Sequence, residues 1–555
     1  TKSPLKPGFL TLDFLSPYLE YLCAQIEEAV RLFPGCDGVF LDIIMQEAGC
    51  SKWRLEYLRE NGLDPEKEAD RKAAADAALL RYYQMTTAAV KCLDADMPVF
   101  HNCGHISRGD REFLKHCSHL ELESLPTGGW GYDHFPMSAR YAENLGLDFL
   151  GMTGKFHTTW GEFGGFKHPN ALRYECAAML ACNAKCSVGD QLHPSGVLDV
   201  STYRLIGEAY REVASKEEWC VNARAVSDIA VLSSEAEKRG MRDSLPDEGA
   251  ARVLLEGHFL FELLDRDMDF GRFKLVILPD DVEVDDFLVR KINDHLSRGG
   301  KLLLSGKSGF NSAGAPAFDI GAAHFGTSPF SPDFVLPEPR FRTDHVDSPV
   351  VFYLSSERIK ADSGKSLGKV FDPWFNRTFQ HFCSHQHAPY RDEPSGYDCG
   401  VENGAIVYLA HPVFSLYRAY GAVVYREYIA KVIAHLLGGR QTVSVSLPSA
   451  ARVFLNYQEE ERRHILHLLY ANPTARGGAM RFAAGTLEAA GARIEVIEDL
   501  TPLRDIRLTV RGLPEVSRIT LEPQGTEISF TRQEGGIFFS VEEVCCHQIV
   551  VLHER

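Results

Sequence analysis

The sequence predicts a mixed α/β protein of three domains: a (β/α)8 TIM barrel, a flavodoxin- or amidotransferase-like doubly wound α/β domain, and a C-terminal β-sandwich. Three patterns predict this class. Helix and strand signals alternate first, short apolar strands separated by helices follow, and short alternating segments with frequent turns come last. A chain of 555 residues also exceeds one compact core. We therefore expect domains at 1–222, 223–442 and 443–555.

The barrel domain opens with a helix and then a strand. Ser16 and Pro17 are typical of a helix start, apolar residues recur at helical spacing, and Pro34 ends the helix. The run 37–43 predicts a buried parallel strand that ends in an acid, Asp42. Four more units follow, with helices at about 65–93, 111–116, 137–145 and 169–184 and strands at 98–102, 119–123, 148–153 and 185–190.

Serial helix–strand units predict a parallel sheet, and polar residues at the carboxyl ends of its strands favour a (β/α)8 barrel. Five strands would leave such a barrel open, and the chain starts on a helix. Because open sheet edges are costly, we expect the first three β/α units to be absent from this sequence.

The other two domains differ from the first in their pattern of helix and strand signals. The middle domain has apolar strands at 228–233, 273–279 and 300–305, helices at 285–298 and 425–437, and a long insertion at about 306–400 that we expect to be irregular. The last domain has short strands at 452–456, 464–469, 506–510, 528–530, 537–541 and 549–552. Their spacing is typical of a β-sandwich.

Composition narrows the possible partners. A formal charge of -17 without Lys/Arg clusters argues against nucleic acid or an anionic membrane and fits a neutral ligand. The chain has no apolar run of membrane-spanning length and no signal-peptide pattern at its start, so we expect a cytoplasmic protein. Its 14 cysteines lack paired spacing and are expected to be reduced thiols.

The densest group of candidate functional residues lies at 119–136. Leu120 and Leu122 alternate with Glu121 and Glu123, which predicts a strand with both carboxylates on one face. The loop after this strand carries aromatic and hydrogen-bonding side chains suited to a sugar ring, namely Trp130, Tyr132, Asp133 and His134.

Three acids at strand ends point to glycoside hydrolysis, which uses one carboxylate as nucleophile or base and another as proton donor. Asp42 ends the first strand, and Glu123 lies nearer its strand end than Glu121. We therefore assign acid/base catalysis to Glu123 and sugar binding to Glu121. Alternatively, Asp42 is a helix cap and the glutamates form ion pairs with surrounding helices.

Two further strand ends carry polar and aromatic residues. His157 and Trp160 lie in a glycine-rich loop after one strand, and Asp190 and His193 follow the last strand. Asp190, His193, His101 and His157 also form an alternative set of metal ligands, although the HxH and HExxH spacings are missing from the barrel part. The HxH at 385–387 is expected to lie in a solvated loop, and the run 305–309 is expected to form a tight turn.

The motifs together resemble a known family. Segments 119–136 (HLELESLPTGGWGYDHFP), 149–165 (FLGMTGKFHTTWGEFGG) and 186–194 (CSVGDQLHP), with DGVFLDI before them, resemble the α-L-fucosidases of glycoside hydrolase family 151. They are also similar to glycosidases that carry a domain like the β-galactosidase trimerisation domain. The resemblance implies a (β/α)8 scaffold and a retaining mechanism in which Asp42, ending the fourth strand, is the nucleophile. The sequence departs from the family at its start, so an acid from the missing strands is an alternative proton donor.

An α-L-fucoside fits the candidate residues. The 6-methyl group of fucose needs an apolar wall, which we assign to Trp130, Trp160 and Phe156. We assign the ring hydroxyls to His101, Asn102, His134 and His157, with Tyr132, Asp190 and His193 completing the binding set. No cofactor or metal is expected, and the middle domain is expected to form a homo-oligomer. The alternatives are a β-galactosidase, a metal-dependent hydrolase and a non-catalytic carbohydrate-binding or assembly protein.

Overall fold

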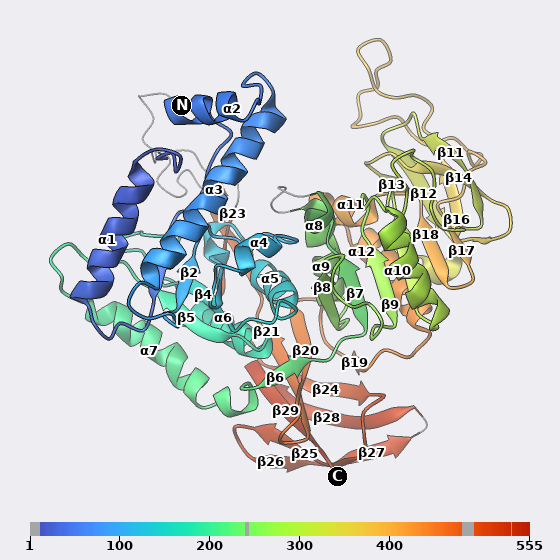
Figure 1. The fold of residues 1–555 in the computed structure, drawn as a ribbon. Coiled ribbons are helices and arrows are strands. Elements are labelled where there is room, and N and C mark those ends of the chain that lie inside the picture. The colour runs from blue at the N-terminus through green and yellow to red at the C-terminus, as the bar shows by residue number, and fades with distance from the viewer. Residues whose placement is uncertain (1–10, 239–243, 480–492, 534) are drawn as a thin grey trace.

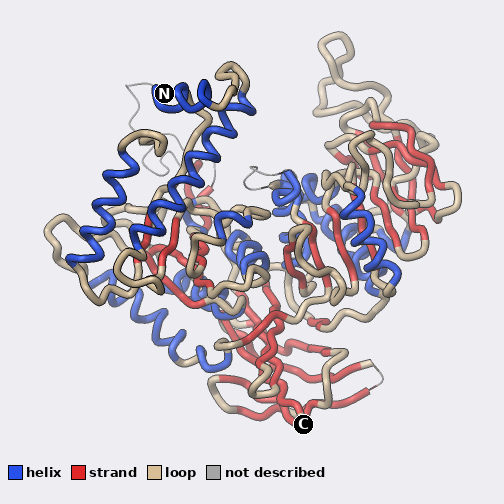
Figure 2. Tube along the Cα trace, viewed as in Figure 1, coloured by secondary structure: helices blue, strands red, loops and turns tan. Residues whose placement is uncertain are grey.

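The computed structural model describes residues 11–238, 244–479, 493–533 and 535–555. It confirms a mixed α/β protein with many sheets, in which a helical first part, a middle α/β part and an almost wholly β last part are distinct (Figures 1 and 2). All fourteen cysteines are free thiols, as expected. Among the described residues, every helix is too short or too polar to cross a lipid bilayer.

The first part alternates helices and parallel strands. Its elements are α1 (Tyr18–Leu32), β1 (Val39–Leu41), α2 (Lys52–Glu60), α3 (Glu68–Val90), β2 (Val99–His101), α4 (Arg111–Leu114), β3 (Leu120–Glu123), α5 (His134–Ala142), β4 (Phe149–Gly154), α6 (Pro169–Ala181), β5 (Lys185–Gly189) and α7 (Val200–Ala214). β1 pairs with β2, and β3, β4 and β5 pair in that order, all in parallel. A hydrogen bond from Ser118 N to Val99 O (2.9 Å) joins the two groups. The carboxyl ends of the five strands therefore share one side.

Helix packing fixes the outer face of these strands. Ile26 and Val30 on α1 pack against Ala89 and Val90 on α3, as the helical spacing predicts. Gly151 on β4 lies so close to the outer layer that a Cβ there would come within 2.5 Å of Met179 on α6. Side chains that alternate to the other face of each strand are thus directed away from these helices.

The middle part is built on a seven-stranded sheet. Its order is β15 (Lys365–Ser366), β17 (Gly400–Asn403), β18 (Ile406–Leu409), β10 (Lys301–Ser305), β9 (Leu275–Leu278), β7 (Ile229–Leu232) and β8 (Phe261–Leu264). The last five are parallel, and β17 and β15 are antiparallel. Helices α8 (Ser234–Lys238), α9 (Leu245–Glu256), α10 (Asp286–Ser297), α11 (Val413–Tyr420) and α12 (Val423–Leu437) accompany the sheet.

The insertion that was expected to be irregular contains strands, so that expectation was wrong. β11 (Ala322–Thr327) pairs with β14 (Glu357–Ala361), and β12 (Asp333–Pro337) lies between β13 (Val350–Phe352) and β16 (Gly368–Phe371). These strands are only three to six residues long and are separated by turns rich in Pro, Ser and Asp. Such short runs depend on their partner strands, which a local pattern does not reveal.

The last part contains two antiparallel sheets that share one apolar core. One is ordered β19 (Val443–Val445), β24 (Leu503–Val510), β28 (Gly536–Val544), β27 (Phe530–Gln533), and the other β26 (Thr526–Ile528), β25 (Val516–Glu522), β29 (Cys546–Glu554), β21 (Arg463–Tyr470), β20 (Ala451–Gln458), β6 (Ala223–Ala225). β22 (Thr474–Ala479) and β23 (Arg493–Val496) pair separately in antiparallel orientation. Because β6 directly follows the first part, this sheet ties the end of the first part to the last part of the chain (Figure 1).

Candidate active site

Three polar side chains meet where β1, β2 and β3 end. Asp42 follows β1, Asn102 follows β2, and Glu123 is the last residue of β3. The side-chain nitrogen Nδ2 of Asn102 donates to Asp42 Oδ1 (2.9 Å) and to Glu123 Oε2 (3.0 Å). Because both oxygens contact one nitrogen, they are no more than about 6 Å apart. One amide group therefore holds both carboxylates.

The orientation of the Asn102 amide is set from its other end. Gly104 N donates to Asn102 Oδ1 at 2.9 Å, so the oxygen is held away from the two acids and the NH2 group is directed at them. Asn102 is itself buried. An amide turned the other way would place its oxygen against two carboxylates and leave the Gly104 N–H without this acceptor.

Asp42 is more open than the sequence suggested. β1 is only half-buried, with Phe40 43% exposed, and Asp42 is exposed. The expectation of a buried strand was therefore wrong here. Asp42 Oδ1 also accepts from Ile43 N at 2.9 Å, and Ile43 has a φ of 55°. A β-branched residue seldom adopts this conformation, and such strain is concentrated at functional sites.

The alternation predicted for β3 is confirmed. Leu120 and Leu122 are buried, while Glu121 and Glu123 are half-buried on the opposite face. Glu121 Oε1 lies 2.9 Å from Nε2 of His119, which is two residues earlier in the chain, and not beside a cation of the helical layer. Both glutamates thus face the same side of the sheet as Asp42 and Asn102, with Glu121 one layer deeper.

His101 lies outside this site, which corrects the expectation that it binds a sugar hydroxyl. Its ring is fully buried, with Nε2 3.1 Å from Thr87 Oγ1 and Nδ1 3.3 Å from Tyr82 OH, both on α3. Burial lowers the pKa of His101 to about 4, which favours the neutral ring. Since neighbouring residues on a strand point to opposite faces, His101 and Asn102 cannot both face the site.

The loop after β3 divides its residues between an open group and a packed group. The rings of Trp130 and His134 meet edge to face at 5.0 Å, and His134 Nδ1 lies 3.1 Å from Ser124 Oγ. Tyr132 instead packs on Tyr174 of α6, with ring centroids 5.8 Å apart and its hydroxyl oxygen buried. The hydroxyl of Tyr132 is therefore not presented to a ligand, contrary to the sequence-based assignment.

Asp133 in the same loop has a structural role that the sequence did not indicate. Its carboxylate accepts from Arg252 on α9 (2.9 Å) and from Arg452 on β20 (2.7 Å). Burial alone would raise the pKa of Asp133, but the two arginines outweigh it and hold that pKa below the ordinary value. These partners are 119 and 319 residues away in the chain, so no local motif could reveal them.

A second loop, between β4 and α6, is organised by a residue that the sequence reasoning passed over. Glu162 Oε2 accepts from the backbone N–H groups of His157 (3.0 Å) and Thr158 (2.9 Å), and Oε1 accepts from Thr158 Oγ1 (2.9 Å). A carboxylate four residues after Thr158 in a loop of Gly and Trp was the available signal. Through these bonds Glu162 fixes the half-buried His157.

Trp160 in this loop lies across the ends of β4 and β5. Its ring meets that of Phe156 at 5.6 Å, and a Cβ on Gly189 would come within 2.6 Å of it. Phe156 is only 1% exposed, which corrects its assignment to the apolar wall of the site. Gly189 is thus required for close approach of the indole of Trp160.

The solvent exposure of the side chains increases along the residues after β5. Asp190 accepts from Gln191 N at 2.7 Å and lies 3.9 Å from Lys155 Nζ, with its side chain 15% exposed. His193 is exposed on the following turn, where its Nδ1 lies 2.9 Å from Ser195 Oγ. Within the described ranges, no three His, Cys, Asp or Glu side chains are grouped so as to hold a metal ion. The alternative ligand set is therefore not assembled.

Comparison with known proteins gives matches at two levels of similarity. No protein-family model and no curated protein matches the chain. Among solved structures, the α-L-fucosidase isoenzyme 2 from Paenibacillus thiaminolyticus is 41% identical, with a TM-score of 0.93 over 100% of this chain and 82% of that chain.

Several of the distant matches are β-galactosidases. Those from Bacillus circulans sp. alkalophilus (12% identity, TM-score 0.64, 97% of this chain and 83% of that chain) and Halorubrum lacusprofundi (13%, 0.59, 98% and 84%) share the fold. At this level of identity they inform the architecture alone. The close match, by contrast, is sufficient to place the chain in a family.

Proposed function

Because the chain belongs to the family of the Paenibacillus α-L-fucosidase isoenzyme 2, and is a glycoside hydrolase on that ground, we propose that it removes terminal α-L-fucose with retention of configuration. The bridge from Asn102 to Asp42 and Glu123 is the observation that carries the proposal. Two carboxylates whose bonded oxygens lie within about 6 Å fit the ~5 to 5.5 Å separation of retaining enzymes better than the ~6.5 to 9.5 Å of inverting ones.

The roles follow from exposure and position. Asp42 is exposed, and Asn102 and Ile43 both donate to its Oδ1. Because Oδ2 accepts neither of these hydrogen bonds, Asp42 is the better nucleophile. It attacks the anomeric carbon, and the bond from that carbon to the aglycone oxygen breaks while Glu123 donates its proton to that oxygen. The product of this step is a fucosyl ester of Asp42 together with the free aglycone.

The second step reverses the roles of the same groups. Glu123, now a carboxylate, takes a proton from water, and the water oxygen attacks the anomeric carbon as the Asp42 ester bond breaks. Two inversions give net retention. Asn102 donates to both carboxylates throughout, so it holds their separation at the value that this double displacement needs.

We propose that the remaining open residues bind the sugar. Trp130 and Trp160 supply faces for the ring and its methyl group, His134 packs against Trp130, and His157 is in the same loop as Trp160. Glu121 lies one layer below Glu123 on β3, Asp190 follows the end of β5, and His193 is on the exposed turn after it. His101, Tyr132 and Phe156 are left out because their reactive or apolar parts are buried.

The proposal is tested by comparing paired substrates. The purified protein should hydrolyse 4-nitrophenyl α-L-fucoside at least about a hundredfold faster than 4-nitrophenyl β-D-galactoside, since the D-sugar has the opposite absolute configuration and also carries a 6-hydroxyl group where the site has a methyl-binding wall. Proton NMR should show the α anomer of fucose as the first product. Preference for the galactoside, or the β anomer first, would contradict the proposal.

A further inference from the structure

The Asn102 amide is held by a loop, and side chains of the middle part of the protein bind this loop. Residues 103–110 connect β2 to α4, and Gly104 at the start of this loop supplies the N–H that orients Asn102. Gly104 has a φ of 72°, which suits glycine and turns the chain sharply after the site. Any shift of this loop therefore reaches the amide that bridges the two carboxylates.

Glu235 on α8 is the main contact of the loop. Its Oε1 lies 2.6 Å from His105 Nε2 and accepts from Arg108 N at 3.1 Å, while its Oε2 lies 3.0 Å from Arg108 Nη1. Arg108 Nη1 also donates to Asp247 of α9 at 2.9 Å. The Glu235, Arg108 and Asp247 side chains are at most 2% exposed. This carboxylate thus holds the loop through three contacts with two residues, one of them to the backbone of Arg108.

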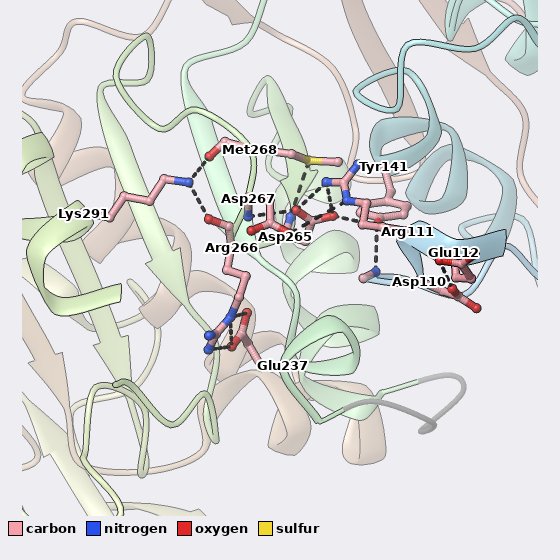
Figure 3. A network of polar contacts seen from close by, with 11 residues as sticks. Asp110, Arg111, Glu112, Tyr141, Glu237, Asp265, Arg266, Asp267, Met268 and Lys291 are labelled. Atoms are coloured by element: carbon pink, nitrogen blue, oxygen red, sulfur yellow. Dashed lines mark hydrogen bonds and ion pairs between the residues drawn. The ribbon is translucent and has the colours of Figure 1, made fainter. Parts of the chain in front are cut away.

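The far end of the same loop is fixed by a second contact with the middle part (Figure 3). Arg111 Nη2 donates to both carboxylate oxygens of Asp265 (2.7 and 2.6 Å). Tyr141 OH donates to Asp265 Oδ2 (2.8 Å) and accepts from Gly109 N (2.8 Å). With this end anchored independently, loss of Glu235 would release mainly the segment near Gly104.

We propose that Glu235 is a positioning residue for hydrolysis: from the middle part of the protein it holds His105 and Arg108, so that Gly104 keeps the Asn102 amide directed at Asp42 and Glu123. The inference rests on the proposed function for its kinetic consequence but not for its structural one. It gives the middle part a role in the chemistry of the first, through one buried carboxylate. Removing the contacts misplaces the two acids without altering any group that touches the sugar.

The test uses Glu235→Gln in the full chain, with Glu237→Gln as the matched control. Glu237 is on the same helix and pairs with Arg266 (3.0 Å), away from the loop. We expect Glu235→Gln to lower kcat for 4-nitrophenyl α-L-fucoside by about ten- to a hundredfold, as small misplacements of catalytic groups do, with KM within about twofold. Glu237→Gln should change kcat by less than about twofold.

A double-mutant cycle separates positioning from general destabilisation. In an Asn102→Ala background, Glu235→Gln should lower kcat by less than about twofold, because the amide through which it acts is gone. An equal loss in both backgrounds, or no loss in the wild-type background, would overturn the inference. Thermal unfolding of each variant shows whether the chain is folded at the assay temperature.

A crystal structure of Glu235→Ala gives a readout that needs no turnover. We expect Asn102 Nδ2 to lose at least one of its two carboxylate contacts, and unchanged contacts to both would overturn the inference. A wild-type protein that fails to cleave fucosides would contradict the proposed function. The Asn102 contacts in the Glu235→Ala structure would still decide whether Glu235 positions Asn102. Failure of the two proposals is therefore distinguishable.

Discussion

Glu123 donates and accepts the proton in the proposed mechanism, so its loss should depend on the leaving group. Glu123→Gln should lower kcat/KM for an alkyl or sugar aglycone by about 10²- to 10⁴-fold, the usual contribution of a positioned acid. With a 2,4-dinitrophenyl aglycone, which leaves without a proton, the first step should be nearly unaffected. Steady-state and burst kinetics on the two substrates measure this.

The control for Glu123→Gln is Glu28→Gln, the same change at an exposed position on α1. It should alter neither rate by more than about twofold, as expected for a surface substitution away from special features. Equal losses on both aglycones in Glu123→Gln would remove Glu123 from the proton-transfer role.

A histidine pair makes stability depend on pH. His467 Nδ1 and His547 Nε2 lie 3.0 Å apart between β21 and β29, and both rings are buried. Burial lowers the pKa of His467 to about 3 and that of His547 well below its ordinary value. The unfolded chain therefore binds more protons below about pH 6.5. Stability should be full above this pH and should fall steadily as pH decreases from 6.5 towards 3.

The slope of this pH dependence is measurable. Each neutral buried ring costs at most about 1.4 kcal/mol of unfolding free energy per pH unit in this window. Urea unfolding between pH 7 and 5 should show a smaller slope for His467→Gln than for wild type, while His385→Gln, at an exposed position, should keep the wild-type slope. A slope unchanged in His467→Gln would contradict the explanation.

Single residues were only partly predictable from the sequence. The period-2 alternation of β3 placed Glu121 and Glu123 on one face, and the structure confirms it. The same rule, applied to His101 and Asn102, would have excluded one of them, but both were assigned to the sugar. Asn102 is 60 residues from Asp42 and 21 residues from Glu123 in the chain, so the bridge between them depends on the fold rather than on a local pattern.

The loop between β4 and α6 requires a glycine at the end of β5, where Trp160 packs against Gly189. Gly189→Ala would place a Cβ about 2.6 Å from Trp160, so the indole must move off the strand ends. We expect KM for the fucoside to rise several-fold and unfolding free energy to fall by about 1 to 3 kcal/mol. Gly207→Ala on α7, where a Cβ would meet only Arg211 Nη1 at an ordinary contact distance of 3.8 Å, is the control and should be neutral or stabilising. Unchanged KM in Gly189→Ala would argue against a sugar-binding role for Trp160.

Elements were predictable where pattern and burial agree. The helix 18–32 and the parallel strands of the first part follow from helical spacing and apolar runs, and the structure has them close to the expected places. The insertion failed because its strands are short and are stabilised by partners such as the β11–β14 pair. β1 failed in burial rather than in type: its apolar run VFL is half-exposed in the described residues.

At the scale of the whole molecule, buried ion pairs connect the three parts. Asp133 joins α9 and β20, Glu235 joins the middle part to the loop after β2, and Asp265 joins it to α4. Breaking one partner of a buried pair typically costs about 3 to 5 kcal/mol. The domain limits at 222 and 442 remain a proposal, and the polar contacts across them indicate that the parts act together.

Assembly into a homo-oligomer also remains a prediction, and one surface supports it. Phe379 is fully exposed, and Phe382 and Trp374 are 65% and 56% exposed, in the segment between β16 and β17. Large apolar side chains left exposed together mark contact sites for partners. Light scattering at micromolar concentration should give a multiple of 61.9 kDa, and Phe379→Ser with Phe382→Ser should lower it. A wild-type monomer would contradict the prediction.

Trapping the glycosyl-enzyme tests the central claim most directly. A 2-deoxy-2-fluoro-L-fucosyl fluoride forms the ester with the nucleophile but slows its hydrolysis, because fluorine destabilises the oxocarbenium-like transition state. Mass spectrometry of the intact protein should show one added fluorofucosyl group, and peptide mapping should place it on Asp42. Inactivation with the label on another carboxylate, or full turnover of fucosides with no label at all, would contradict the claim that Asp42 and Glu123 form a retaining pair.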